Sequence, residues 1–130
     1  MSLRRPGFEG RYIVVADEDR TIANEIIEVL TADGHAVFLA YDGLSALELA
    51  FGLKVCDLVI SNSRVGGKPG VELIHELRTM LPWVSVLYLA NGGRSTPELE
   101  RRLPPGVRIL REPFSDAELR EAVGSLLPEF

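Results

Sequence analysis

Asp57-Leu-Val-Ile-Ser-Asn-Ser-Arg-Val-Gly-Gly-Lys-Pro-Gly70 is the stretch of sequence that decides the fold. It begins with a short apolar run, 58–60, which predicts a buried strand. It ends in a loop rich in glycine and proline that leads into a helix. In an open sheet of parallel strands, chemistry takes place just beyond the carboxyl end of such a strand. Asn62 stands at that point, so we expect it at the centre of any functional site.

Composition and charge narrow the class of protein. The chain has 130 residues, of which 46% are hydrophobic, which fits one domain with a sizeable core. A formal net charge of −5 argues against nucleic acid as the main partner. A single cysteine excludes an internal disulfide and favours a cytoplasmic protein. No apolar run reaches the roughly 18 residues of a membrane span. We expect residues 1–10 to form a flexible tail and residues 11–130 to form the domain.

Strand-like and helix-like segments alternate along the whole domain. Alternation of this kind predicts a parallel sheet with helices on both faces. Asp42, Ser95 or Thr96, and Ser115 with Glu118 stand where helices need caps. Apolar β-type runs cover 12–16, 35–40, 58–60, 84–90 and 107–110, and apolar residues recur at helical spacing within 22–30, 44–49, 71–81, a short segment after Pro97, and 119–127.

Several short motifs occur in a characteristic order, and together they resemble those of a known family. They are Val14-Val-Ala-Asp-Glu18, Tyr41-Asp-Gly-Leu-Ser-Ala-Leu-Glu48, Asp57-Leu-Val-Ile60, Gly70 and Glu112-Pro-Phe114. From about residue 11 to residue 127, the chain resembles a response-regulator receiver domain, the phosphate-accepting module of two-component signalling. The resemblance implies an α/β, flavodoxin-like (βα)5 fold, doubly wound around a five-stranded parallel sheet in the order 2-1-3-4-5.

The resemblance also implies which residue types the family uses, and this chain lacks most of them. In the family, an aspartate after the third strand accepts phosphate, two acids after the first strand hold Mg²⁺, and a Ser or Thr, a Lys and an aromatic residue complete the site. Here the corresponding positions are degenerate. Asn62 stands for the acceptor, Ala16 for the first acid, Leu89 for the hydroxyl, Glu112 for the lysine, Ile109 for the aromatic residue and Gly66 for a proline, while Asp17 keeps the second acid.

An amide cannot act as the carboxylate nucleophile, so Asn62 cannot form an acyl phosphate. We therefore expect no catalytic residue, no enzyme activity and a pocket that is negative because its lysine is lost. Three arrangements are open. Asp17 and Glu112 are solvated loop acids, or they bind a divalent ion such as Mg²⁺ together with the Asn62 carbonyl, or Asn62 and Glu112 share a hydrogen bond. No cofactor is expected apart from this ion.

The sequence thus predicts a degenerate receiver that acts by protein–protein contacts. Candidate partners are a histidine kinase or an output protein, and a homodimer through the fourth helix, fifth strand and fifth helix. Two alternatives remain: a phosphorylation-competent regulator with a displaced acceptor, and a small-ligand or flavin binder on the same fold. We expect Ser61 and Ser63 to satisfy loop backbone groups, His35 and His75 to be surface or packing residues, and Cys56 to lie in the core.

Overall fold

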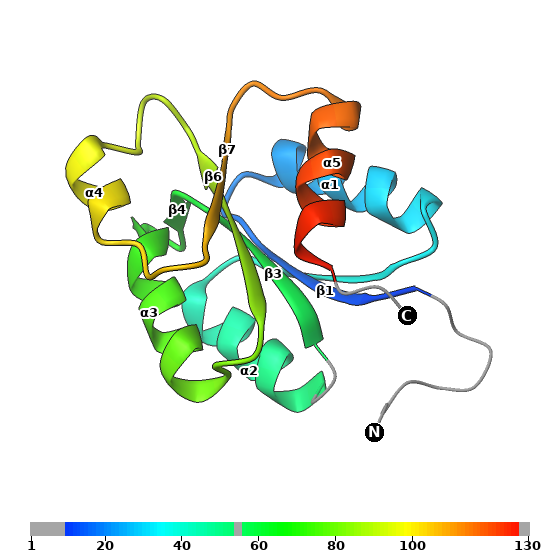
Figure 1. The fold of residues 1–130 in the computed structure, drawn as a ribbon, viewed down its shortest axis with the longest axis horizontal. Coiled ribbons are helices and arrows are strands. Elements are labelled where there is room, and N and C mark those ends of the chain that lie inside the picture. The colour runs from blue at the N-terminus through cyan, green and yellow to red at the C-terminus, as the bar shows by residue number, and fades with distance from the viewer. Residues whose placement is uncertain (1–9, 54–55, 128–130) are drawn as a thin grey trace.

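A five-stranded parallel sheet forms the centre of the molecule (Figure 1). The computed structural model describes residues 10–53 and 56–127, so the tail predicted for residues 1–10 lies outside the described residues except for Gly10. The strand order β2-β1-β3-β6-β7 is the predicted order 2-1-3-4-5. The strands are β1 (Tyr12–Ala16), β2 (Ala36–Ala40), β3 (Cys56–Asn62), β6 (Ser85–Ala90) and β7 (Arg108–Arg111).

Helices cover both faces of the sheet, as the alternating pattern predicts. Two helices pack on one face and three lie on the other (Figure 1). The longest has 13 residues, and none in the described part of the chain has the length and apolar character to cross a bilayer. The first face carries α1 (Arg20–Ala32) and α5 (Asp116–Leu126), and the second carries α2 (Gly43–Leu53), α3 (Gly70–Met80) and the short α4 (Pro97–Arg101).

The central strands are apolar on both sides because both of their faces are covered. Ile13 and Ile60 point toward α1 and α5, whereas Val14 and Val59 point toward α2 and α3, and all four are fully buried. Cys56 is also buried, and burial raises the pKa of its thiol to about 12, as suits the predicted core residue.

The predicted helix caps form. Asp42 accepts a hydrogen bond from the Ser45 amide at 2.7 Å before α2, and Thr96 caps α4. Ser115 and Glu118 make a reciprocal capping box at the start of α5. Each cap satisfies amide groups that have no partner within the first helical turn.

One structural feature in the decisive loop was not predicted from sequence. Residues 64–69 form a small antiparallel hairpin of β4 (Arg64–Val65) and β5 (Lys68–Pro69) rather than an irregular loop. Its turn residues, Gly66 and Gly67, have φ angles of +59° and +79°. A proline, whose φ is fixed near −65°, cannot take the place of Gly66 in this turn.

Candidate functional site

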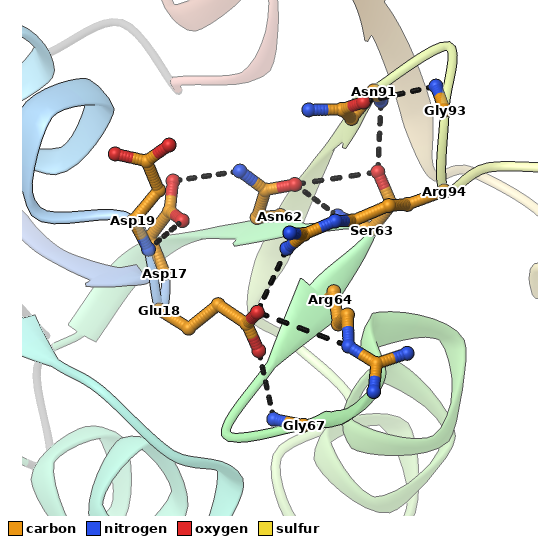
Figure 2. A network of polar contacts seen from close by, with 10 residues as sticks. All are labelled: Asp17, Glu18, Asp19, Asn62, Ser63, Arg64, Gly67, Asn91, Gly93 and Arg94. Atoms are coloured by element: carbon orange, nitrogen blue, oxygen red, sulfur yellow. Dashed lines mark hydrogen bonds and ion pairs between the residues drawn. The ribbon is translucent and has the colours of Figure 1, made fainter.

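The site lies at the carboxyl ends of β1, β3 and β6, where the fold brings three loops together (Figure 2). Asn62 ends β3 directly beside Leu89 of β6, and Asp17 follows β1. The side-chain nitrogen of Asn62 donates a hydrogen bond to Asp17 Oδ2 at 2.8 Å. Asn62 is only 4% exposed and Asp17 is fully buried, so this contact is shielded from water.

The other end of the Asn62 side chain is also occupied. Its Oδ1 accepts a hydrogen bond from the Ser63 backbone amide at 2.6 Å, and Ser63 Oγ lies 3.3 Å away. Ser63 Oγ in turn donates to the Leu89 carbonyl at 2.7 Å and accepts from the Asn91 amide at 2.8 Å. The hydroxyl therefore joins β3 to the end of β6, which confirms the structural role predicted for this serine.

Ser61 has a comparable local role. It is fully buried, and its hydroxyl donates to the Asn62 carbonyl at 3.0 Å. That carbonyl lies so close to α3 that a Cβ atom on Gly70 would be 2.0 Å from its oxygen. The Gly70 amide donates to the Ser63 carbonyl at 2.8 Å. Position 70 thus needs a glycine because two backbone segments approach closely there. Positions 66 and 67 favour glycine because their φ angles are positive.

Asp17 is not a solvated loop acid, so that expectation is wrong for this residue. Burial raises the pKa of its carboxyl group to about 6, while the hydrogen bonds from Asn62 and from the Asp19 amide oppose the rise. Both carboxyl oxygens have a donor, at 2.8 Å to Asn62 and 2.9 Å to Asp19. The structure therefore holds Asp17 in place as a hydrogen-bond acceptor.

Glu112 has the opposite environment. Its backbone amide donates to the Ala90 carbonyl at 3.0 Å, which places the residue just beyond β7. Both of its carboxyl oxygens are buried, and neither has a hydrogen bond of good geometry among the described residues. Burial and then the charge of Asp17 raise the pKa of this carboxyl group, and the nearby Asn91 side chain only partly opposes the rise. The predicted Asn62–Glu112 hydrogen bond is wrong, because Asn62 bonds to Asp17 and Ser63 instead.

A residue that the sequence prediction passed over connects three loops of the site. Glu18 accepts a hydrogen bond from the Gly67 amide at 2.7 Å and forms an ion pair with Arg94 at 2.7 Å (Figure 2). Arg64 Nε lies 3.8 Å from the same carboxylate. These two arginines offset the charge of Glu18, which is not one of the two acids, Asp17 and Glu112, that were expected to make the pocket negative. Arg64 and Arg94 were missed because only the fold brings their loops to Glu18.

Two of the residues predicted to bind the ion, Asp17 and Asn62, make hydrogen bonds within the protein. Asn62 presents its nitrogen to Asp17 and uses its oxygen for Ser63, so the amide has no free oxygen facing the acids. Within residues 10–53 and 56–127, no three His, Cys, Asp or Glu side chains gather as metal ligands would. Binding of Mg²⁺ by Asp17, Glu112 and Asn62 thus stays a prediction that only a titration tests.

Two further positions that were predicted to be degenerate are apolar and packed. Leu89 is fully buried in the cluster under α1 and α5, so it offers nothing to a phosphoryl group. Ile109 is partly buried and packs against the cluster on the opposite face. His35 accepts a hydrogen bond from the Arg11 amide at 3.0 Å, and the His75 ring contacts the Arg102 carbonyl at 2.5 Å. Both histidines have the structural roles predicted for them.

Comparison with known proteins identifies the family. The model of the response regulator receiver domain matches residues 13–124. The chain belongs to this family. Receiver domains interact with kinases and phosphotransferases of two-component systems. The sheet order of this chain agrees with the receiver fold.

Individual relatives are distant in sequence. Over 116 residues the chain is 25% identical to sporulation initiation phosphotransferase F of Bacillus subtilis, which covers 89% of this chain and 93% of that protein. It is 32% identical to the uncharacterized transcriptional regulatory protein YrkP of Bacillus subtilis, covering 85% of this chain but only 47% of that protein. The chain thus spans about half the length of this second relative.

Solved structures match the fold over most of the chain. Chemotaxis protein CheY4 of Vibrio cholerae superposes with a TM-score of 0.81 at 21% identity, over 91% of this chain and 99% of that one. A response regulator receiver protein from Sinorhizobium medicae gives a TM-score of 0.79 at 25% identity, over 91% and 94% of the two chains.

Proposed function

We propose that this receiver domain is not switched by phosphorylation at Asn62 and signals through protein–protein contacts. The observation that carries the proposal is the pairing of Asn62 at both ends of its amide, with Asp17 and with Ser63. Formation of an acyl phosphate needs a carboxylate oxygen as nucleophile, and the amide supplies none. The side chain acts instead as a link between β1 and β3.

The surroundings of Asn62 support the same conclusion. Leu89 gives an apolar side chain where a hydroxyl would contact phosphate. The buried carboxyl group of Glu112 would repel a phosphoryl group if it were charged. The neighbouring hydroxyls offer no displaced acceptor at the surface, since Ser61 and Ser63 are 0% and 1% exposed and both bond to backbone carbonyls.

Treatment with acetyl phosphate and Mg²⁺ tests the proposal. We expect the intact mass to stay unchanged and the backbone NMR signals of 62–70 not to move. Asn62→Asp is the matched control, because it restores a carboxylate at the same strand end. A phosphoryl adduct on the unmodified chain would overturn the proposal and would support the alternative of a displaced acceptor. Trp83 fluorescence would be a poor reporter of this site, since Trp83 precedes β6 at the opposite end of the sheet and is 65% exposed.

The same proposal includes a contact surface formed by α4, β7 and α5. In α4 no residue is buried, and Glu100 of this helix pairs with Arg111 of β7 at 2.6 Å. We propose that this face supports a homodimer or receives a kinase or an output protein. Sedimentation of the purified chain over a range of concentrations tests the dimer, and Arg111→Glu is expected to weaken it. A sedimentation coefficient that stays at the monomer value at every concentration would rule the dimer out.

A further inference from the structure

A cavity beside the Asn62 network opens between α1 and the loops that follow β6 and β7, and Asn91 belongs to both. Its volume is about 360 Å³, within the range of small-molecule sites. One wall is apolar, formed by Ile22, Pro113 and Phe114. Two carboxylate residues, Glu25 of α1 and Glu112, also line the cavity. The cavity thus combines apolar walls with negative charge.

Glu112 is the polar side chain of this cavity that the described residues leave unsatisfied. Both oxygens of its carboxyl group are buried and lack a hydrogen bond of good geometry, although the Asn91 side chain, which also lines the cavity, lies near enough to lower the pKa of the carboxyl group. A buried carboxylate without a partner is costly, and a donor carrying positive charge removes most of that cost. Asp17 cannot help, because its charge has the same sign and raises the pKa of Glu112 further.

The chemistry of the walls selects among possible cations. A divalent metal ion needs several oxygen ligands, whereas the side-chain oxygens of Asp17 and Asn62 already accept hydrogen bonds within the protein. An ammonium group supplies its own N–H donors and needs only one carboxylate to accept them. An alkyl stem attached to it would be stabilised by contact with Ile22 and Phe114. The cavity therefore suits a cation that carries its own apolar chain.

We propose that this cavity binds a protonated primary amine on an alkyl chain, with Glu112 as its counter-ion and Ile22, Pro113 and Phe114 around the stem. The carboxyl oxygens are buried, so binding requires a rotation of the Glu112 side chain toward the ligand. The lysine side chain of a partner protein and a free alkyl diamine share this chemistry. The proposal does not depend on whether Asn62 accepts phosphate.

An NMR titration with three small probes tests this site. The probes are Nα-acetyl-lysine methylamide, 1,5-diaminopentane and Nα-acetyl-norleucine methylamide, which has a similar stem but no ammonium group. We expect saturable shifts of the Ile22 methyl signals and of the Gly92 and Phe114 amides with the two amines. The norleucine compound should bind about tenfold more weakly, since it lacks a charge-assisted hydrogen bond.

Two variants distinguish a specific role of Glu112 from a general effect of removing a negative charge from the surface. Glu112→Gln should weaken amine binding about tenfold, whereas Glu98→Gln, an exposed change on α4, should leave it unchanged. Preference for the lysine compound would indicate a partner's side chain as the source, and preference for the diamine would indicate a free polyamine.

Either of two outcomes would overturn the proposal. One is the absence of saturable shifts with both amines at millimolar concentration. The other is unchanged binding in Glu112→Gln. Treatment with acetyl phosphate measures modification at Asn62, whereas the titration measures binding at Glu112, so the failure of one proposal does not imply the failure of the other.

Discussion

Two sides of the site differ in how their polar atoms are satisfied. On the side of β1 and β3, Asp17, Asn62 and Ser63 form a continuous buried network in which each functional group has a partner. On the side of β7, the Glu112 carboxyl group is buried with no hydrogen-bond partner among the residues described. The first side joins strands, and the second leaves an unsatisfied acid beside a cavity.

The difference indicates what each side contributes. Removing one partner from a buried network costs more than a hydrogen bond is worth, because the other group is left desolvated. The paired side therefore contributes to stability, and its residues should be hard to replace. The unpaired side carries a cost in the folded state, so replacing Glu112 should stabilise the protein. Stability measurements on single variants test this contrast directly.

The largest effect is expected for Gly70→Ala, on the paired side. The added Cβ would lie 2.0 Å from the Asn62 carbonyl oxygen, so β3 or α3 must shift. We expect a loss of roughly 3 kcal/mol or more in the free energy of unfolding, measured by urea denaturation. Gly124→Ala is the matched control. A Cβ added to Gly124 in α5 would meet nothing within 4 Å, so a gain of about 1 kcal/mol is expected. Equal effects of the two changes would contradict the close approach.

A smaller but clear loss is expected for Asn62→Ala. The change removes the donor to Asp17 and the acceptor for the Ser63 amide, both in buried surroundings. We expect a loss of about 2–3 kcal/mol by chemical denaturation. Asn24→Ala, at an exposed position of α1, serves as control and should be neutral or slightly stabilising. A neutral Asn62→Ala would show that the network does not stabilise the fold.

The pH dependence of stability follows from the raised pKa values of Asp17 and Glu112. An acid whose pKa is higher in the folded state binds more protons there, so stability falls as pH rises between the unfolded and folded pKa values. For Asp17 this window runs from 3.8 to about 6. We expect the free energy of unfolding to be greater near pH 5 than near pH 7.5, by up to about 1.4 kcal/mol for Asp17.

The opposite trend should appear at lower pH. Asp42, Glu100 and Glu121 have lowered pKa values because of hydrogen bonds from Ser45, Arg111 and Arg108, respectively. Their stabilising contributions are lost as pH falls through those folded-state values. Thermal melting across pH 3–8 should therefore show a maximum near pH 5. A steady rise in stability up to pH 8 would contradict the burial of Asp17.

On the unpaired side, Glu112→Gln should increase stability modestly. The amide removes a partly desolvated charge near Asp17. We expect a gain of up to about 1 kcal/mol at pH 7.5 and a smaller gain at pH 5, where more of the wild-type carboxyl group is protonated. Glu98→Gln, at a residue whose side chain is 75% exposed, should change stability little at either pH. A destabilising Glu112→Gln would reveal a partner for the carboxylate.

The smallest effect is expected for the contact between Glu18 and Arg94. The pair is short, at 2.7 Å, but the Arg94 side chain is 50% exposed. Exposed ion pairs contribute roughly 1 kcal/mol or less, and salt weakens them. A double-mutant cycle with Glu18→Gln and Arg94→Gln should give a coupling energy within that limit that decreases in high salt. A coupling energy well above it would place Glu18 with the buried network.

Sequence reasoning reached the fold more completely than the site. Strand β1 was predicted residue for residue, and the other sheet strands and all five helices were predicted with end points shifted by a few residues. The β4–β5 hairpin was missed because two-residue strands carry no periodic pattern. At the site, the family resemblance indicated the positions expected to be degenerate, but three arrangements of Asp17, Asn62 and Glu112 were left open and none contained the Asn62–Asp17 hydrogen bond. Several polar groups could form a hydrogen bond with the Asn62 amide at similar energy, and the spacing of residues in the sequence does not show which of them does.

By itself, the sequence determined the alternation of strands and helices, the caps at Asp42 and Ser115, and the amide at position 62. These depend on local patterns of apolar residues, turn residues and capping side chains. Only the tertiary structure decided that Asn62 bonds to Asp17, that Glu18 reaches Arg94, and that Glu112 lacks a hydrogen-bond partner among the described residues. Such contacts join loops distant in the chain, and small differences in burial and distance decide which of them form.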